Sequence, residues 1–325
     1  MCHNSSCGPS GRKKGSVYAP PIASLDEPGG VYTPESADAN GNAGLHGLIL
    51  NISETAWVTR LERAADELLR IGGTVFSLAI VGLGVETLLW ARYAAYDKNF
   101  GAPYKAIPVI PFLPQIPWLA YAFGAILAAC GVALLSRRTV RTAAMVVGSL
   151  MFLGAVLLDA PKYFANLDNM SVRTELFEPV ALATLAWLLP GRDATPPFLE
   201  RASRYLLALS YVVFGVDHFL ALAPIGTLIP NWIPWHVFWI AFFGAGFIAA
   251  GVGIALNVLL RYAAAGIGLM YAIWVFTLHI PRVFGLYGGA GPKNPDEWSS
   301  LLIAIALWGG SWALARANQE APAQP

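Results

Sequence analysis

Five polar side chains in the second half of the chain stand in otherwise apolar surroundings: Asp217, His218, His236, His279 and Arg282. A carboxylate accepts hydrogen bonds, a guanidinium donates them, and an imidazole can do either and exchanges protons near neutral pH. Together these groups could bind an anion or the polar head group of a ring-bearing molecule. Trp235, which directly precedes His236, could help to hold such a ring.

The end of one apolar stretch, "LHIPRVF", indicates how such a site can be built. His279 and Arg282 are three residues apart, so they share one face of a helix. Pro281 has no amide hydrogen and crowds the carbonyl of Thr277, which leaves a free acceptor beside two donors. We therefore expect a polar, anion-tolerant corner at the mouth of this helix.

The elements that carry these residues are predicted to be membrane-spanning helices. Of the 325 residues, 56% are hydrophobic and 13% are charged, about half the charged share of a soluble domain. Several stretches approach the roughly 20 apolar residues that cross a bilayer. They are Val75–Ala91, Trp118–Leu135, Ala143–Leu158, Val172–Leu189, Tyr205–Leu222, Trp235–Leu256, Ala263–Leu278 and Leu301–Leu314. We predict an all-α integral membrane protein with about eight transmembrane helices.

Ionisable groups inside a bilayer cost a few kcal/mol, so they usually pair or line a cavity. We therefore expect Asp217 and Arg282 to form an ion pair, bridged by one of the histidines. The alternative for Arg282 is that it reaches up to the interface beside an aromatic belt of Trp232, Trp235 and Trp239. This alternative fits Asp217 less well, because Asp217 lies several residues inside its apolar stretch.

The chain divides into five predicted parts. Residues 1–52 are rich in Gly, Pro, Ser, Asn and Asp, which predicts a disordered tail. Residues 53–71 carry an apolar stripe typical of an amphipathic helix on the membrane surface. Residues 72–190 and 191–316 are predicted to form two four-helix units, and residues 317–325 a disordered C-terminus.

The two four-helix units look like copies of one another. At an offset of 120 positions, glycine, arginine and proline residues coincide; the pairs include Gly124 with Gly244, Gly131 with Gly251, Arg141 with Arg261 and Pro161 with Pro281. Upstream the offset is 131, where Glu86 coincides with Asp217. Shared composition does not readily align these residue types over about 40 positions, so we predict a duplication with two parallel repeats.

The first unit keeps the charges of the second but lacks its imidazoles. Its counterparts of Asp217, His279 and Arg282 are Glu86, Asp159 and Lys162, and residues 72–190 contain no histidine. Any chemistry that needs histidine is therefore predicted for the second unit, and the first unit is expected to be a scaffold.

The positions of basic residues predict the orientation. Fourteen Lys and Arg residues fall on one side of the predicted helices and seven on the other. The richer side is expected to face the cytoplasm. This places both termini in the cytoplasm, the polar helix ends at the outer face, and the protein in the inner membrane.

Other kinds of site find little support. The net charge of +1 gives no electrostatic case for nucleic acid. Cys2 and Cys7 flank His3 at a spacing that fits no zinc pattern, and Cys130 lies in an apolar helix, so no metal site is predicted. Haem is disfavoured because the membrane histidines lie near helix ends. Neither a nucleotide fingerprint nor a catalytic triad predicts a stand-alone enzyme.

Residues Tyr205 to Ala315 resemble the DoxX/DoxD-like family of four-helix membrane proteins. The resemblance is carried by "GVDHF", "LIPNWIPWHVFW", "GAGFIAAGVGIAL" before "RYAAAGIGLM", and "LHIPRV". The first half resembles a diverged second copy, although many members are single units. Similar proteins are linked to quinone-coupled oxidation of sulfur compounds, as subunits of membrane oxidoreductases, and to redox-stress complexes. The resemblance implies a polar pocket formed by Asp217, His218, His236, His279 and Arg282.

Three functions remain open from the sequence. The first is an accessory subunit of a quinone-linked or other electron-transfer membrane complex, with a quinone or anion pocket in the second unit. The second is a transporter or binding protein for a small molecule or lipid. The third is a purely structural subunit of a larger assembly. The expected partners are the lipid bilayer, other membrane subunits, and a quinone or an anionic small molecule.

Overall fold

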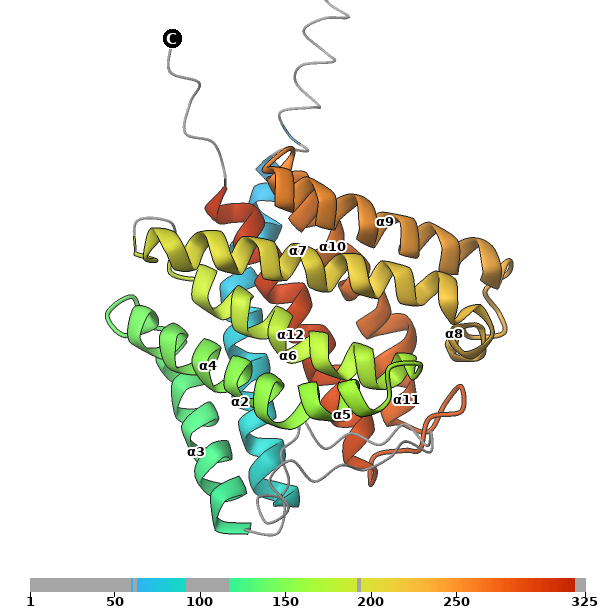
Figure 1. Ribbon diagram of the computed structural model, residues 1–325, viewed down its shortest axis with the longest axis horizontal. Helices are drawn as coiled ribbons and strands as arrows, with labels where there is room; N and C mark the ends of the chain where they lie inside the picture. The colour runs from blue at the N-terminus through green and yellow to red at the C-terminus, as the bar shows by residue number, and fades with distance from the viewer. Residues whose placement is uncertain (1–59, 61–62, 92–116, 192–193, 319–325) are drawn as a thin grey trace, which may run out of the picture. The chain divides into compact units, whose positions relative to one another are not determined.

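The computed structural model of the protein describes residues 60, 63–91, 117–191 and 194–318 (Figure 1). All of them belong to the unit Thr59–Pro325. Within these residues every regular element is a helix and there is no β-strand. The predicted tail over 1–52, with Cys2 and Cys7, lies outside the described residues, as does most of the predicted C-terminal segment.

The helices coincide with the apolar stretches read from the sequence. Most extend a few residues beyond them, because capping and charged residues at helix ends lower the local hydropathy. The elements are α2 (Gly72–Trp90), α3 (Pro117–Leu134), α4 (Val140–Gly154), α5 (Ala160–Ala165), α6 (Met170–Leu188), α7 (Pro197–Leu220), α8 (Leu222–Leu228), α9 (His236–Leu256), α10 (Leu260–Trp274), α11 (Ile280–Val283) and α12 (Pro295–Ala317).

By length and composition, five helices of the described chain could each cross a membrane, and six could do so if α7 and α8 form one bent span. The multi-pass membrane character predicted from the sequence is therefore supported. The helix Trp118–Leu134 is shorter than these five. Helix α6 carries Arg173, Glu175 and Glu178, which reduce its hydropathy.

The predicted surface helix over 53–71 is described only from residue 63 onward, apart from residue 60. Residues 63–70 are helical, and a turn at Ile71 leads into α2. Leu69 is buried, whereas Leu68 is 55% exposed. The Asp66 carboxylate forms an ion pair with Arg261 at the start of α10. The described part of this segment is therefore tied to the second half of the chain.

Two helices contain a π-helical turn just before a proline. Residues Ala155–Asp159 connect α4 to α5, and residues Val275–His279 connect α10 to α11. In each case the amide of the following residue, Ala160 or Ile280, donates to the carbonyl five residues back. Because proline lacks an amide hydrogen, the normal helical pattern cannot continue there. The sequence predicted the disturbance at Pro281 but not the π turn.

Glycines allow the helices to approach closely. A Cβ on Gly84 of α2 would lie 2.7 Å from the carbonyl oxygen of Gly124 in α3, and a Cβ on Gly215 of α7 would lie 2.6 Å from that of Gly244 in α9. Gly251 of α9 similarly packs on the backbone of α7. Gly246 of α9 makes no such contact, since a Cβ there would meet no described atom within 4 Å.

The two halves of the chain form one helical bundle. Helix α2 packs beside α12, α6 packs beside α7, and α6 also contacts α12 (Figure 1). The buried apolar core continues through both halves, from Phe76 and Leu83 to Phe247 and Leu307. Side chains near helix ends can therefore meet partners from the other half of the sequence.

Candidate functional site

A cavity among the described helices has a volume of about 860 Å³, within the usual range of roughly 300–1,000 Å³ for small-molecule sites. It lies among α6, α7, α8, α9, α10 and α12, at the end of the bundle where α7 ends and α9 begins. Every lining residue except those of α6 comes from the second predicted unit. This cavity is the candidate functional site.

The structure brings four of the six predicted second-unit residues to this cavity: Asp217, His218, His279 and Arg282. Trp235 and His236 are not among its lining residues. Trp235 is 77% exposed and has a left-handed backbone conformation, with a φ of 59°, directly before the start of α9. Trp232 and Trp239, which flank it in sequence, do line the cavity.

The predicted ion pair between Asp217 and Arg282 is wrong, because each residue has another partner. The Nε of Arg173 donates to Asp217 Oδ1 at 2.7 Å, and the Thr174 hydroxyl donates to Oδ2 at 2.9 Å. Asp217 is 3% exposed. Both donors lie within the first five residues of α6, which belongs to the other half of the chain. Asp217 therefore joins α7 to α6 at the cavity wall.

Arg282 is held by Glu297 at the start of α12. Its Nη2 and Nε donate to the two carboxylate oxygens at 2.9 and 3.1 Å, and its Nη1 donates to the Tyr287 carbonyl at 3.2 Å. The amide of Ala290 also donates to Glu297, at 3.0 Å. A bidentate carboxylate offsets the guanidinium charge. The polar corner predicted at this helix end therefore contains a carboxylate as well, and Arg282 organises the loop between α11 and α12.

His218 is held rigidly at the cavity wall. Its Nδ1 lies 2.7 Å from the carbonyl oxygen of Phe214. Its ring stacks on Trp274 with a centroid distance of 5.5 Å and an interplanar angle of 14°, and lies 5.4 Å from the ring of Phe247. Because a carbonyl only accepts, Nδ1 carries a hydrogen, and Nε2 is the nitrogen left for a ligand.

An aromatic wall continues from His218 along α9 and α10. Ring centroids lie 5.3 Å apart between Phe243 and Trp274, 5.6 Å between Phe247 and Tyr271, and 6.0 Å between Trp239 and Phe243. All five of these residues line the cavity. Sequence reasoning recognised tryptophans near His236 but did not find this wall.

Two buried polar atoms at the cavity have no hydrogen-bond partner within the described chain. They are the Nε1 of Trp239 and the hydroxyl oxygen of Ser300, and both residues line the cavity. Burying a polar group without a partner costs about 1–3 kcal/mol, and native proteins leave few such groups. Both atoms are buried, so a ligand in the cavity could bond to them only after neighbouring side chains move.

The three first-unit counterparts lie outside this cavity. Glu86 of α2 is buried and accepts a hydrogen bond from the Ser299 hydroxyl of α12. Lys162 Nζ lies 3.1 Å from Asp159 Oδ1 and 3.8 Å from Glu175 Oε2. None of the three lines the cavity of the second half.

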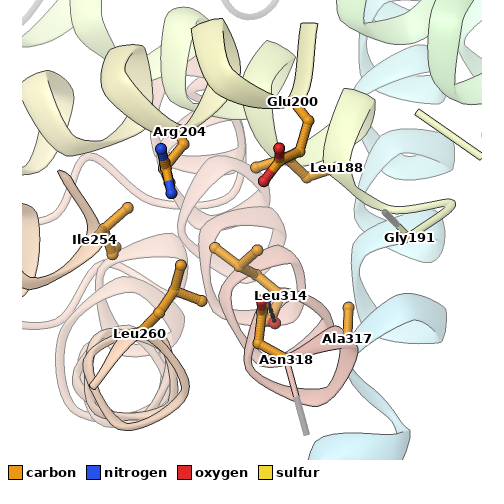
Figure 2. A pocket seen from close by; sticks show the side chains of 9 residues that line it. All are labelled: Leu188, Gly191, Glu200, Arg204, Ile254, Leu260, Leu314, Ala317 and Asn318. Atoms are coloured by element: carbon orange, nitrogen blue, oxygen red, sulfur yellow. Dashed lines mark hydrogen bonds between the residues drawn. The ribbon is translucent and has the colours of Figure 1, made fainter. Parts of the chain in front are cut away.

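A second, much smaller pocket lies at the opposite end of α7, α9 and α12. Its volume is about 20 Å³, which is room for about one water molecule. Figure 2 shows Glu200, Arg204 and Asn318 around it, with Leu188, Leu260 and Leu314 supplying apolar walls. This pocket is too small to be a ligand site.

The described residues contain no group of three or more His, Cys, Asp or Glu side chains that could hold a metal ion. Comparison with protein-family models, with curated proteins and with solved structures finds no match to this chain. The function is therefore inferred from the cavity itself.

Proposed function

We propose that the chain is an integral membrane protein that binds a quinone-class ligand in its second-half cavity, as an accessory subunit of an electron-transfer complex. The observation that carries this proposal is the cavity of about 860 Å³, with an aromatic wall and the oriented imidazole of His218. Apolar walls with a few placed polar groups are typical of small-molecule sites.

The charges around the cavity favour a neutral ligand over an anion. Asp217 is paired with Arg173, and Arg282 is paired with Glu297. To bind Arg282, an anion would have to displace the bidentate carboxylate of Glu297. An uncharged ligand would not have to displace it. We therefore favour a quinone over an anionic small molecule as the ligand of this cavity.

The residues present fit a quinone-class head group. Trp239 Nε1 can donate to a ring oxygen, Ser300 can donate or accept, and His218 Nε2 can exchange a proton with a ring oxygen. Trp274 and Phe243 provide flat apolar surfaces for the ring. When bound, such a group would supply reversible two-electron, two-proton chemistry.

We further propose that the fold is a tandem duplication of a DoxX/DoxD-like four-helix unit, with eight transmembrane helices. Matched features support it. The π turns lie 120 residues apart, and the close contact of Gly84 with Gly124 parallels that of Gly215 with Gly244. In each half, a hydroxyl on the last helix also donates a hydrogen bond to the buried carboxylate on the first helix of the other half. Ser299 donates to Glu86, and Thr174 donates to Asp217.

The proposed setting is the inner membrane, with both termini in the cytoplasm and the cavity at the outer face. The distribution of basic residues supports this orientation. Other membrane subunits are the proposed partners. Isolation of the native protein in a mild detergent, followed by mass spectrometry, should recover electron-transfer subunits in a fixed ratio. Isolation of the chain alone would contradict the role as a subunit.

Ligand extraction tests the quinone proposal. Purified protein should carry a quinone that organic extraction and mass spectrometry quantify per chain. The variant Trp274→Ala removes the surface on which His218 stacks, so it should lose most of that quinone. Trp118→Ala is the matched control, since Trp118 lies on α3 outside the cavity and is 67% exposed. Equal retention by both variants would contradict the proposal.

One observation favours a transporter as a second candidate. Helices α7 and α8 meet at a bend of 94°, and the cavity is lined by residues of α8 such as Pro224 and Thr227. Broken helices line the substrate sites of many transporters. Proteoliposomes would then move a fluorescent phospholipid between leaflets faster than protein-free vesicles. The quinone-subunit proposal predicts no difference between the two.

A further inference from the structure

We propose that the cavity selects the reduced form of its ligand: the Nε2 of His218 accepts a hydrogen bond from a ring hydroxyl, so a dihydroxy-aromatic molecule binds more tightly than the corresponding dione. This inference rests on the proposed function and specifies the form of the ligand. It concerns binding alone, since the electron acceptor is supplied by another component.

The tautomer of His218 follows from its hydrogen bond. Phe214 offers its carbonyl oxygen at 2.7 Å from Nδ1, and a carbonyl oxygen cannot donate. Nδ1 must therefore carry hydrogen, and in the neutral ring Nε2 has a lone pair and no hydrogen. Nε2 has no hydrogen-bond partner among the described residues, and His218 lines the cavity. The cavity wall thus presents an acceptor.

The ring cannot easily turn to present its other nitrogen. Trp274 stacks on one side of it at 5.5 Å, and Phe247 lies 5.4 Å away. Helix α9 also packs tightly behind it, because a Cβ on Gly244 would lie only 2.9 Å from the Cβ of His218. A half-turn of the ring would keep its plane on Trp274 but would place Cδ2 instead of Nδ1 against the Phe214 carbonyl, so the hydrogen bond to Phe214 fixes which nitrogen faces the cavity.

Two other polar residues of the cavity wall, Trp239 and Ser300, are compatible with a hydroxyl. Trp239 Nε1 can only donate, so it suits the lone pair of a ligand oxygen. A ring hydroxyl has both a hydrogen for His218 and lone pairs for such a donor. A dione has lone pairs alone, so it would satisfy Trp239 but would set an oxygen lone pair against Nε2. Ser300 can donate or accept and does not distinguish the two forms.

The arginines near the cavity do not reverse this preference. Arg282 lines the cavity, but its donors are directed at Glu297 and Tyr287. Arg173 is directed at Asp217. Neither guanidinium is therefore set up to favour the carbonyl oxygens of a dione.

Anaerobic equilibrium dialysis of the full chain in detergent micelles tests the selection. The probes are a decyl-substituted benzoquinone and the hydroquinone obtained by its reduction. The wild-type protein should bind the hydroquinone at least about tenfold more tightly, the effect of roughly one hydrogen bond. In His218→Gln the preference should fall to about twofold or less, because an amide can donate as well as accept. The control is His236→Gln, outside the cavity, which should keep the wild-type preference.

The outcomes separate the two proposals. Equal binding of both forms by the wild-type protein, tighter binding of the dione, or an unchanged preference in His218→Gln overturns the selection by His218 and leaves the quinone site standing. Failure of both probes to bind the wild-type protein overturns the proposed function. The preference of the wild-type protein for the hydroquinone is measured without any variant. The inference therefore remains testable if His218→Gln does not fold.

Discussion

The two predicted halves of the bundle differ in the side chains that they place at corresponding positions of the sequence. Four cavity aromatics, Phe243, Phe247, Tyr271 and Trp274, have Phe123, Leu127, Met151 and Gly154 at the positions 120 residues earlier. Leu127 is 1% exposed and Met151 is fully buried. Two of these first-half positions therefore hold packed aliphatic side chains and only Phe123 is aromatic, whereas all four second-half positions place rings at the cavity.

The same contrast holds for the polar residue on the first helix of each half. His218 and Thr87, 131 positions apart, each bond to the carbonyl four residues before them, at 2.7 Å to Phe214 and 2.9 Å to Leu83. Thr87 is buried, while His218 keeps a second nitrogen at the cavity. Under the proposed duplication, the same helix position therefore holds a packing residue in the first half and a cavity-lining histidine in the second.

The largest expected effect comes from the carboxylate that joins the halves. Asp217→Asn leaves the Arg173 guanidinium without its charge partner in a buried site, so the free energy of unfolding should fall by about 3 kcal/mol or more. Detergent-induced unfolding followed by circular dichroism measures the loss. Asp66→Asn, which breaks the more exposed pair with Arg261, should cost about 1 kcal/mol or less. Equal losses would contradict the structural role of Asp217.

Two matched glycine substitutions sharpen the comparison between halves. Gly244→Ala and Gly124→Ala both crowd a helix contact, since their Cβ atoms would lie 2.9 Å from His218 Cβ and 2.8 Å from Gly84 O. Each should lower the free energy of unfolding by about 1–3 kcal/mol. Only Gly244→Ala should also weaken quinone binding, because only it displaces His218.

The control for both is Gly246→Ala, which meets no described atom within 4 Å. Its stability should stay unchanged or rise by up to about 1 kcal/mol, because alanine is the better helix former. Quinone content per folded chain should be measured for all three variants. Loss of the ligand from Gly124→Ala as well as from Gly244→Ala would contradict the contrast between the two halves.

A smaller effect is expected at Arg282. Arg282→Lys keeps the charge but loses the bidentate geometry toward Glu297, so it should cost about 1 kcal/mol. Amides of the loop over 285–294 should exchange hydrogen faster, because Tyr287 and Ala290 are bonded to this pair. Hydrogen-exchange mass spectrometry measures the change. Loss of ligand without faster loop exchange would restore Arg282 as a direct ligand-binding residue.

The smallest effect is expected at the edge of the cavity. Trp232 Nε1 donates to the Tyr287 hydroxyl at 3.1 Å, and Trp232 is 64% exposed. Trp232→Phe should change the free energy of unfolding by less than about 0.5 kcal/mol and leave the ligand in place. Unfolding titration and ligand extraction check both expectations. Loss of the ligand would show that this contact, rather than the aromatic wall, retains it.

The sequence predicted the helices well because hydropathy is a local property. The starts of α6 and α12 lie a few residues earlier than their apolar stretches, where Asn169 and Asn294 cap the helices. The same reasoning placed His218, His279 and Arg282 near one another, since they occur at ends of helices that share one side of the bundle. These were inferences from order and composition alone.

The ion pairs and the aromatic wall could not be predicted in this way. Arg173 is far from Asp217 in the sequence, and Glu297 lies on a different helix from Arg282. Only the packing of α6 and α12 in the folded chain brings the members of each pair together. Phe242 is 56% exposed, whereas Phe247 is 1% exposed. Both occur in the same apolar run, and an aromatic ring facing lipid has the same hydropathy as one facing a cavity.

Photoaffinity labelling tests the central claim most directly. Full-length protein in micelles would be illuminated with a photoreactive decyl-benzoquinone analogue, with and without excess decyl-hydroquinone, and the labelled peptides would be mapped by mass spectrometry. Our account predicts competed labelling confined to the cavity segments of the second half, chiefly α9 and α10 around Trp239 and Trp274. Labelling spread equally over α3 and α4, or labelling that the hydroquinone does not displace, would contradict it.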